Sequence, residues 1–309
     1  MKILVTGGAG FIGSHVVDAY VQAGHDVVVV DDLSTGHREN LNPKARFHQL
    51  DVTDPRVIEL VRDERPAVLN LHAAQMDVRR SVADPAFDAR VNILGLINLL
   101  DGARRANVRR VILVSSGGAV YGEQTSFPAP ESHPTNPVSP YGVSKRAGEL
   151  YAFFYQAEYQ LPFTALRYAN VYGPRQDPHG EAGVVAIFSG RMLRAEPVTV
   201  YGDGCNTRDY VYVGDVVRAN LLALERECIG PVNVGTGIET DVNTLARMLL
   251  EISGSRSRIE HGPARAGEQR RSVIECSLAA ARLAWKPEVS LADGLARTVE
   301  FFRARAAGG

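Results

Sequence analysis

A short apolar stretch followed at once by closely spaced glycines constrains this chain more than any other part of its sequence. Residues 2–6 are typical of a buried strand, and residues 7–13 (Gly-Gly-Ala-Gly-Phe-Ile-Gly) precede an apolar pattern of helical period that runs to about Gln22. Glycines at this place let the backbone approach a pyrophosphate, whose charge then lies on amide groups at the positive end of a helix. The stretch therefore predicts a dinucleotide site between a first strand and a first helix.

The second apolar run, residues 27–30, leads to a pair of carboxylates. It ends at Asp31, which lies 18 residues beyond Gly13 and is followed by Asp32. A carboxylate at the end of the second strand can accept hydrogen bonds from the ribose hydroxyls of an adenosine, and it would repel a 2'-phosphate. The pair therefore favours NAD over NADP as the cofactor.

Further apolar runs predict more strands of the same sheet, at residues 46–50, 67–71 and 111–114. In an open α/β sheet, ligands bind at the carboxyl ends of the strands. We therefore expect Asp51 to meet the adenine amino group, and Ala73 and Ala74 are small enough to let a dinucleotide lie across them. The hydroxyls of Ser115 and Ser116 are expected beside the nicotinamide, where they can bind a substrate oxygen.

The segment from Asp84 to Asn107 is predicted to be one long helix, with Asp84 and Pro85 as its cap and first turn. Asn92 lies among apolar neighbours within it. Because a buried amide must be hydrogen-bonded, we expect Asn92 to bind backbone and to support the strand that leads to the site.

A tyrosine and a lysine follow a second helix start. Ser139 is the expected N-cap and Pro140 the first helical residue, so Tyr141 and Lys145 share one helix face. A phenol with a reference pKa of about 10 is a poor base at neutral pH, and a nearby cation lowers its pKa. The pair is therefore a candidate general base with its electrostatic partner. The same spacing also occurs in helices where both side chains merely face solvent.

These elements predict an α/β protein with a Rossmann-type doubly wound parallel sheet and a smaller C-terminal α/β substrate-binding domain. A change to Pro- and Gly-rich sequence after Gly173 is the expected boundary. We assign residues 1–173 to an NAD-binding domain, to which the chain returns at about 208–240, and residues 174–309 mainly to the substrate domain.

Composition excludes several classes of protein. The chain has 309 residues with 34 basic and 35 acidic side chains and no basic block, which argues against nucleic acid or an anionic membrane as a partner. Three distant cysteines fit free thiols in a reducing cytoplasm better than disulfides or zinc, and no metal is expected. No apolar run approaches the roughly 20 residues that span a bilayer, and no signal peptide is expected before the first strand.

Two arginines stand out in the second half, Arg208 in an alternating stretch and Arg265 in a late loop. A planar guanidinium binds two oxygens at once, so a pair of them suits a diphosphate. Either arginine alone is equally consistent with a surface salt bridge.

In this order and spacing the motifs resemble those of the extended short-chain dehydrogenase/reductase superfamily, and most closely the UDP-glucose 4-epimerases. The resemblance extends over nearly the whole chain. It rests on the glycine motif, Asp31, Asp51, residues 115–122, Tyr141 with Lys145, and residues 167–174, 208–210 and 265–268.

The resemblance implies a UDP-sugar 4-epimerase that oxidises the sugar transiently at C4 with bound NAD, and a homodimer formed through the helices of Asn92 and Tyr141. The catalytic residues would be Tyr141, Lys145 and Ser116. NAD would be held by Gly7, Gly10, Phe11, Ile12, Gly13, Asp31, Asp32, Asp51, Val52, Ala73, Ala74, Ser115, Tyr141, Lys145 and Tyr168. The UDP-sugar would be held by Asn170, Gly183, Val184, Tyr201, Arg208, Arg265, Glu268 and Ser272.

Two positions bear on how closely the chain follows that pattern. Epimerases usually carry Ser or Thr where this chain has Gly117, and we expect Ser116, Ser115 or a water to replace that hydroxyl. Four residues after the acidic ribose ligand, some epimerases hold a bulky aromatic that blocks N-acetyl sugars, and this chain has Ser272. We therefore expect UDP-GlcNAc and UDP-GalNAc to be accepted beside UDP-glucose and UDP-galactose, unless Ser272 faces solvent.

Other functions remain open. Related dehydratases and decarboxylases place an acidic residue just before Val-Tyr-Gly, where this chain has Gly118 and Ala119. A UDP-glucuronate 4-epimerase differs mainly in contacts to the sugar carboxylate. A non-enzymatic NAD-responsive binding protein is a third alternative, although such relatives commonly lose the tyrosine or the lysine.

Overall fold

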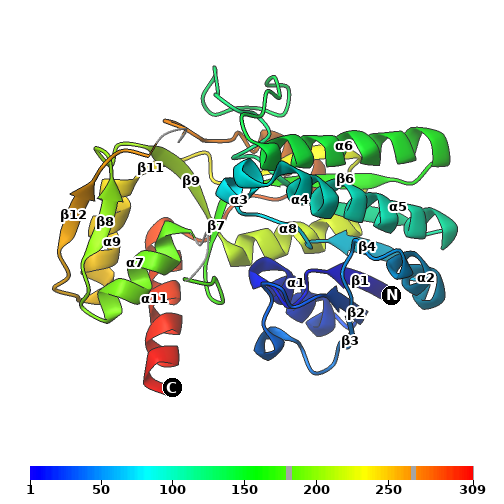
Figure 1. Cartoon of the computed structure of the whole chain (residues 1–309), viewed down its shortest axis with the longest axis horizontal. Coiled ribbons are helices and arrows are strands. Elements are labelled where there is room, and N and C mark those ends of the chain that lie inside the picture. The colour runs from blue at the N-terminus through cyan, green and yellow to red at the C-terminus, as the bar shows by residue number, and fades with distance from the viewer. Residues whose placement is uncertain (179–182, 266–268, 309) are drawn as a thin grey trace.

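Within the residues that the computed structural model describes (1–178, 183–265 and 269–308), a seven-stranded parallel sheet forms the middle layer of the larger part of the molecule, on the right in Figure 1. Its order is β10-β6-β5-β4-β1-β2-β3, and every pair of neighbours is parallel. The strands are β1 (Lys2–Thr6), β2 (Asp26–Asp31), β3 (Arg46–Gln49), β4 (Val68–Leu71), β5 (Arg110–Ser116), β6 (Phe163–Tyr168) and β10 (Gly230–Val234). The order reverses between β1 and β4, which is where ligands bind in such sheets. The predicted Rossmann-type α/β fold is confirmed.

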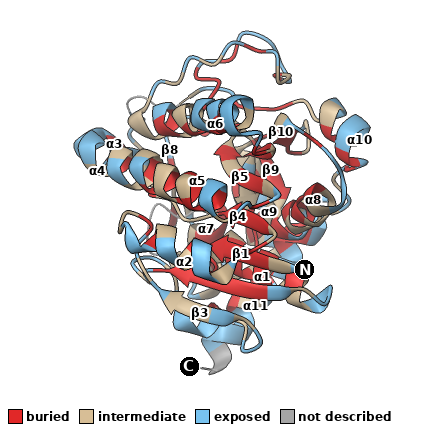
Figure 2. Cartoon of the chain, turned by 90° about the vertical axis from the view of Figure 1, so that its right-hand side faces the viewer, coloured by how far each residue is buried: buried red, intermediate tan, exposed pale blue. Residues whose placement is uncertain are grey.

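Helices cover both faces of this sheet because its strands are apolar on both sides. Helices α1 (Phe11–Gln22) and α8 (Val213–Glu225) lie on one face, where Ile3 and Val5 of β1 are fully buried against them. Helices α2 (Arg56–Glu64), α5 (Gly95–Arg105) and α6 (Pro140–Tyr159) lie on the other face, over Leu4 and its neighbours. Figure 2 shows the buried strands between the partly exposed helices.

The predicted long helix from Asp84 to Asn107 is not uniform. The segment consists of α4 (Pro85–Ala89), a turn of π-helix η2 (Arg90–Leu94) and α5, and it follows the short α3 (Val78–Ala83). The cap is as expected, since the Asp84 carboxylate accepts from the Phe87 amide at 2.9 Å. Asn92 lies in the π-turn, and its amide exchanges two hydrogen bonds of 2.9 Å with the backbone of Gln75, just after β4. Such turns are frequent at functional sites.

A smaller layer of strands and helices lies beside the main sheet (Figure 1). It contains β7 (Asn170–Tyr172), β8 (Val198–Tyr201), β9 (Thr207–Tyr212), β11 (Glu239–Asp241), β12 (Ile259–Gly262), α7 (Val184–Leu193), α9 (Val242–Ser253) and α11 (Leu291–Gly308). Its core includes Met192, Leu249 and Val299. The chain returns to the main sheet through α8 and β10, and α10 (Ser277–Leu283) packs there too. A short η1 (Arg38–Asn40) follows β2. The domain boundaries themselves stay a prediction.

No helix of the described part is long and apolar enough to cross a membrane.

A buried ion pair fastens α6 to the sheet. Arg167 on β6 and Glu149 on α6 each have side chains that are 2% exposed, and they form two hydrogen bonds, of 2.7 Å and 2.6 Å. The hydroxyl of Ser115 also donates to Glu149 at 2.7 Å, and Arg167 donates to Tyr121 at 2.9 Å. Burial works against the charge of Glu149, but the bonds and charge of Arg167 lower its pKa overall. Both charges are thus paired and hydrogen-bonded, as buried charges must be.

We predict that Arg167→Met lowers the free energy of unfolding by about 3 kcal/mol, because the buried Glu149 carboxylate loses its buried cation and keeps only Arg146, whose side chain is 33% exposed. Denaturant unfolding measures the change. Adding Glu149→Leu should recover much of the loss, since the buried charge is then gone. Arg62→Met, in an exposed pair on α2, is the control and should leave the denaturation midpoint nearly unchanged. An equal loss in the two single variants would contradict the prediction.

Candidate active site

The glycine loop between β1 and α1 forms a cradle that side chains would fill. Gly7 has a φ of +69°, and a Cβ built on it would lie 2.6 Å from the backbone nitrogen of Ala73. A Cβ on Gly13 would lie 2.2 Å from the carbonyl oxygen of Gly7. Gly10 is the N-cap of α1, and Phe11 and Ile12 form the first helical turn. The backbone amides at this helix start suit the pyrophosphate of NAD.

Carboxylates stand at the ends of β2 and β3, as the sequence predicts. The Asp31 carboxylate, 7% exposed, accepts from the amides of Ala9 at 3.0 Å and Leu33 at 2.8 Å, so it also ties the glycine loop to β2. Burial raises its pKa. Asp32 is exposed and accepts from the amide of Ser34 at 2.9 Å. Contact of either carboxylate with a ribose stays a prediction.

The next residues in the sheet lie at the same edge. Asp51, which is exposed, follows β3 and accepts from the Thr53 amide at 2.8 Å, and Val52 beside it is buried. Ala73 and Ala74 follow β4, and the amide of Ala73 donates to Thr6 at 3.2 Å. These positions lie at the carboxyl edge where a dinucleotide would cross the switch point.

The tyrosine, lysine and serine expected to act together lie at the junction of α6 and β5. Ser139 caps α6 through the Gly142 amide at 3.2 Å, with Pro140 first in the helix. The Lys145 amine lies 5.7 Å from the centre of the Tyr141 ring and donates to the carbonyl of Val114 at 3.1 Å. The Ser116 hydroxyl lies close enough to the Tyr141 phenol to lower its pKa.

The pKa of Tyr141 is raised in the structure, whereas the sequence predicts that a nearby cation lowers it. Burial raises the pKa of Tyr141 to about 12, the Ser116 hydrogen bond opposes this, and the charge of Asp88 raises it further. Burial lowers the pKa of Lys145 to about 8, and Asp88 opposes that shift. Without further positive charge, the phenol of the protein alone therefore keeps its proton at neutral pH.

Ser115 and Tyr168, which are both predicted to contact NAD, have hydrogen-bond partners within the protein. Ser115 and Ser116 are neighbours on one strand and point to opposite faces. The Ser115 hydroxyl donates to Glu149, so it does not reach the Tyr141 side as expected. Tyr168 is buried, and its hydroxyl accepts from Asn220 of α8 at 2.7 Å. Its hydroxyl proton and its ring remain available to a cofactor.

His72, just after β4, has both ring nitrogens buried without a hydrogen-bond partner among the described residues. Its ring centre lies 6.3 Å from that of Tyr168, and burial together with the charge of Lys145 lowers its pKa to about 3. Buried polar atoms normally have partners. A polar ligand at this place, such as a dinucleotide, fits the orphaned nitrogens.

Polar side chains converge on Gly118. A Cβ built there would lie 3.7 Å from Asn170 Oδ1, 3.9 Å from Ser272 Oγ and 4.0 Å from Ser116 Oγ. Ser272 is 3% exposed, so it does not face solvent. The arrangement brings predicted substrate residues of β7 and a late loop beside the predicted catalytic serine.

Gly117 lacks the hydroxyl that epimerases usually carry, and an aliphatic side chain fills its space. A Cβ at Gly117 would lie 2.8 Å from Cδ1 of Ile274. Of the two serines considered as replacements, Ser116 lowers the pKa of Tyr141, whereas Ser115 donates to Glu149.

The predicted uridine and diphosphate contacts lie in the smaller layer. The Arg265 guanidinium stacks on the Tyr201 ring at 3.6 Å. Arg208 donates to the carbonyls of Thr207 at 2.7 Å and Gln269 at 2.9 Å. Gly183 and Val184 begin α7. Glu268 lies outside the described residues.

Sequence reasoning missed Asp88, which is fully buried in α4. Its carboxylate accepts from Gln75 and Asn92 at 3.0 Å each and from Ser144 at 2.5 Å. The spacing of Asp88 and Asn92, four residues apart among apolar neighbours, would have indicated a shared buried face. No group of three or more potential metal ligands occurs among the residues searched, which are those of the described ranges.

A parallel sheet with a glycine cradle at its switch point, an acidic residue ending β2 and a Tyr-Lys pair beside β5 defines a dinucleotide-dependent protein of the short-chain dehydrogenase/reductase type. Residues 3–235 match the NAD dependent epimerase/dehydratase family. The chain belongs to this family.

Similar proteins include UDP-glucose 4-epimerases. The structure of the Thermotoga maritima enzyme with UDP-glucose is 50% identical, with 99% of this chain and 100% of that chain covered and a TM-score of 0.97. The Thermus thermophilus enzyme in complex with NAD is 44% identical, with 98% and 99% covered and a TM-score of 0.94. The Mycolicibacterium smegmatis UDP-glucose 4-epimerase is 46% identical over 98% of this chain and 99% of its own length.

Proposed function

We propose that this protein is an NAD-dependent UDP-sugar 4-epimerase that interconverts UDP-glucose and UDP-galactose. The observation that carries the proposal is the Ser116–Tyr141–Lys145 arrangement at the carboxyl end of β5, next to the glycine cradle. The similar enzymes bound to UDP-glucose and to NAD support the choice of substrate and cofactor.

The residues divide the reaction between them. NAD supplies a reversible hydride acceptor for C4 of the sugar. Tyr141 takes the proton of the 4-hydroxyl and later returns it, and the Lys145 cation favours the phenolate. Ser116 replaces the hydroxyl missing at Gly117. Asn170, Arg208 and Arg265 hold the diphosphate while the sugar turns over, so that hydride returns to the opposite face.

The rival functions differ at identifiable residues. An elimination or decarboxylation needs a carboxylate before Val-Tyr-Gly, and the chain has Gly118 and Ala119 there. A uronate epimerase would need a cation facing the sugar carboxylate, whereas the side chains around Gly118 are neutral. Incubation with UDP-galactose and, separately, UDP-glucuronate, both without added NAD, distinguishes these functions by product analysis.

We also propose a homodimer and a cytoplasmic location. The outward side of α6 exposes Leu150 (53%), Phe153 (61%) and Phe154 (48%), and Leu94 of η2, an element that contacts α6, is 56% exposed. A contiguous apolar face of this kind is typical of a protein interface. The cytoplasmic location rests on the three free cysteines.

Tyr141→Phe should lower the epimerisation rate by about 10³-fold, because it removes the group that carries the proton. Content of tightly bound NAD and the melting temperature should stay close to wild type. Turnover is measured with UDP-galactose, and bound NAD by its release on denaturation. Undiminished turnover in the variant would exclude Tyr141 as the base, and a wild-type protein that binds NAD without any turnover would favour the non-enzymatic alternative.

The small side chain of Ser272 should admit an N-acetyl group. Wild type is expected to epimerise UDP-GalNAc as well as UDP-galactose, and Ser272→Tyr should lose at least about tenfold more activity on the acetylated sugar, because the ring occupies its space. Ser272→Ala is the control and should keep both activities. A wild type that turns over UDP-galactose alone would contradict the prediction.

The dimer can be tested at the α6 surface. Leu150→Glu combined with Phe154→Glu should yield a monomer by light scattering coupled to size exclusion, since two charges would enter the apolar contact. Ile238→Glu, at an exposed apolar residue of the β10–β11 turn, is the matched control and should remain dimeric. A monomeric wild type would refute the proposal.

A further inference from the structure

Asp88 is a buried carboxylate whose hydrogen-bond donors are all neutral. It is 0% exposed, with the Gln75 and Asn92 amides on one oxygen and the Ser144 hydroxyl on the other. None of the salt bridges between described residues includes Asp88. Such a charge is costly to bury unless a cation lies close enough to offset it.

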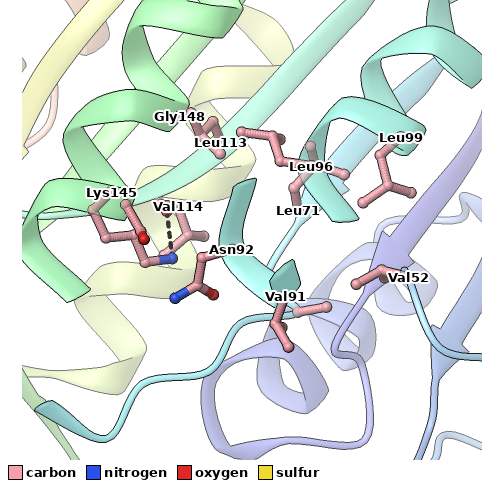
Figure 3. Close-up of a pocket in the computed structure, with 12 residues that line it drawn as sticks. Val52, Leu71, Val91, Asn92, Leu96, Leu99, Leu113, Val114, Lys145 and Gly148 are labelled. Carbon is pink, nitrogen blue, oxygen red and sulfur yellow. Dashed lines mark hydrogen bonds between the residues drawn. The ribbon is translucent and has the colours of Figure 1, made fainter. Parts of the chain in front are cut away.

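Lys145 is the cation on which the charge of Asp88 acts. Ser144, which donates to Asp88, directly precedes Lys145 in α6, and Asn92, which also donates to Asp88, lines a cavity of about 20 Å³ together with Ser144 and Lys145 (Figure 3). The lysine amine donates a hydrogen bond to the neutral carbonyl of Val114, as Figure 3 shows. Two donors of the carboxylate thus line the same small cavity as the lysine.

Few other titratable or charged groups of the described residues lie near Asp88 and Lys145. Tyr141 lies one helical turn before Lys145 on α6, and His72 follows β4. Neither carries a charge at neutral pH in the protein alone, because burial raises the pKa of Tyr141 to about 12 and lowers that of His72 to about 3. On α3, Arg79 and Arg80 are exposed, and the Arg80 guanidinium stacks on the Phe87 ring at 3.9 Å. The charge of Asp88 raises the pKa of Tyr141, and the Lys145 amine lies 5.7 Å from the centre of its ring.

We propose that Asp88 is a positioning residue of the reaction: its buried carboxylate keeps the Lys145 amine cationic, and its bond to Ser144 fixes the helical turn between Tyr141 and Lys145. The proposal rests on the proposed epimerase function. Burial lowers the pKa of Lys145 to about 8, and the charge of Asp88 opposes that shift. Without Asp88 the amine would lose its proton nearer neutral pH, and a neutral amine cannot favour the phenolate.

Asp88→Asn tests the charge separately from the shape. The amide oxygen can accept from Gln75 and Asn92, and the amide nitrogen can donate to the Ser144 hydroxyl, so the contacts remain and the charge is removed. Because the cation is the active form of Lys145, activity is lost as pH rises through its pKa. The alkaline limb of the kcat profile should therefore move to lower pH by about one unit, which is about a tenfold loss above the limb and a smaller loss at pH near 6.

Ser144→Ala is the matched control, because it removes one hydrogen bond and leaves the carboxylate. It should lower the melting temperature without moving the alkaline limb. Bound NAD is measured in every variant, so that loss of cofactor is not mistaken for the effect. An unmoved limb in Asp88→Asn, or a loss at all pH values that follows the melting temperature, would overturn the proposal.

Two further results keep the test decisive. If Asp88→Asn does not fold, Asp88→Ser removes the same charge and must give the same shift. In wild type the alkaline limb of the kcat profile must itself lie near or above pH 8. An alkaline limb below pH 7 would overturn the proposal without any variant. Absence of epimerisation by wild type would instead overturn the proposed function.

Discussion

The bonding of Arg167 to Glu149 is the interaction on which the site most depends. It joins β6 to α6 through two hydrogen bonds between side chains that are almost fully buried. Since Tyr141 and Lys145 lie two turns and one turn before Glu149 on the same helix, the pair sets the rotation of α6 over the sheet. The same cluster includes Ser115 and so leaves Ser116 on the other face, toward the phenol. A structural ion pair thereby determines which of two adjacent serines can take part in chemistry.

The switch point of the sheet brings together segments that lie far apart in the sequence. The glycine loop after β1 approaches the backbone after β4 so closely that a Cβ on Gly7 would lie 2.6 Å from Ala73. From that place the chain after β4 runs to Gln75, whose backbone Asn92 holds through two hydrogen bonds. Close packing and hydrogen bonds therefore join the glycine loop to the helix layer that carries Asp88. Asp88 in turn links Gln75 to Ser144 of α6 through its carboxylate.

The fold was predictable because apolar runs bounded by glycines or carboxylates indicate the buried strands. The run from Ile3 to Val5, which precedes the glycine loop, and the run that ends at Asp31 are examples. Side-chain direction was not: whether Ser115 or Ser116 faces Tyr141 depends on the register of β5 and on Glu149. The reason why Gly117 is small also lies outside local sequence, because Ile274, more than 150 residues away, fills the space. Local sequence places Asp88 and Asn92 four residues apart, but it cannot show that Gln75 and Ser144, from two other segments, also donate to the carboxylate.

Opposed charges also explain why a buried tyrosine can serve as a reversible proton carrier. Burial raises the pKa of Tyr141 to about 12, so the phenol is the resting form, and Asp88 adds to that preference. Asp88 opposes the loss of the proton from Lys145 at the same time. One carboxylate thus makes the base harder to ionise and its cationic partner harder to neutralise. An epimerase needs both, because its tyrosine must give the proton back once the sugar has turned, and a phenolate stabilised too strongly would keep the reaction at the ketone.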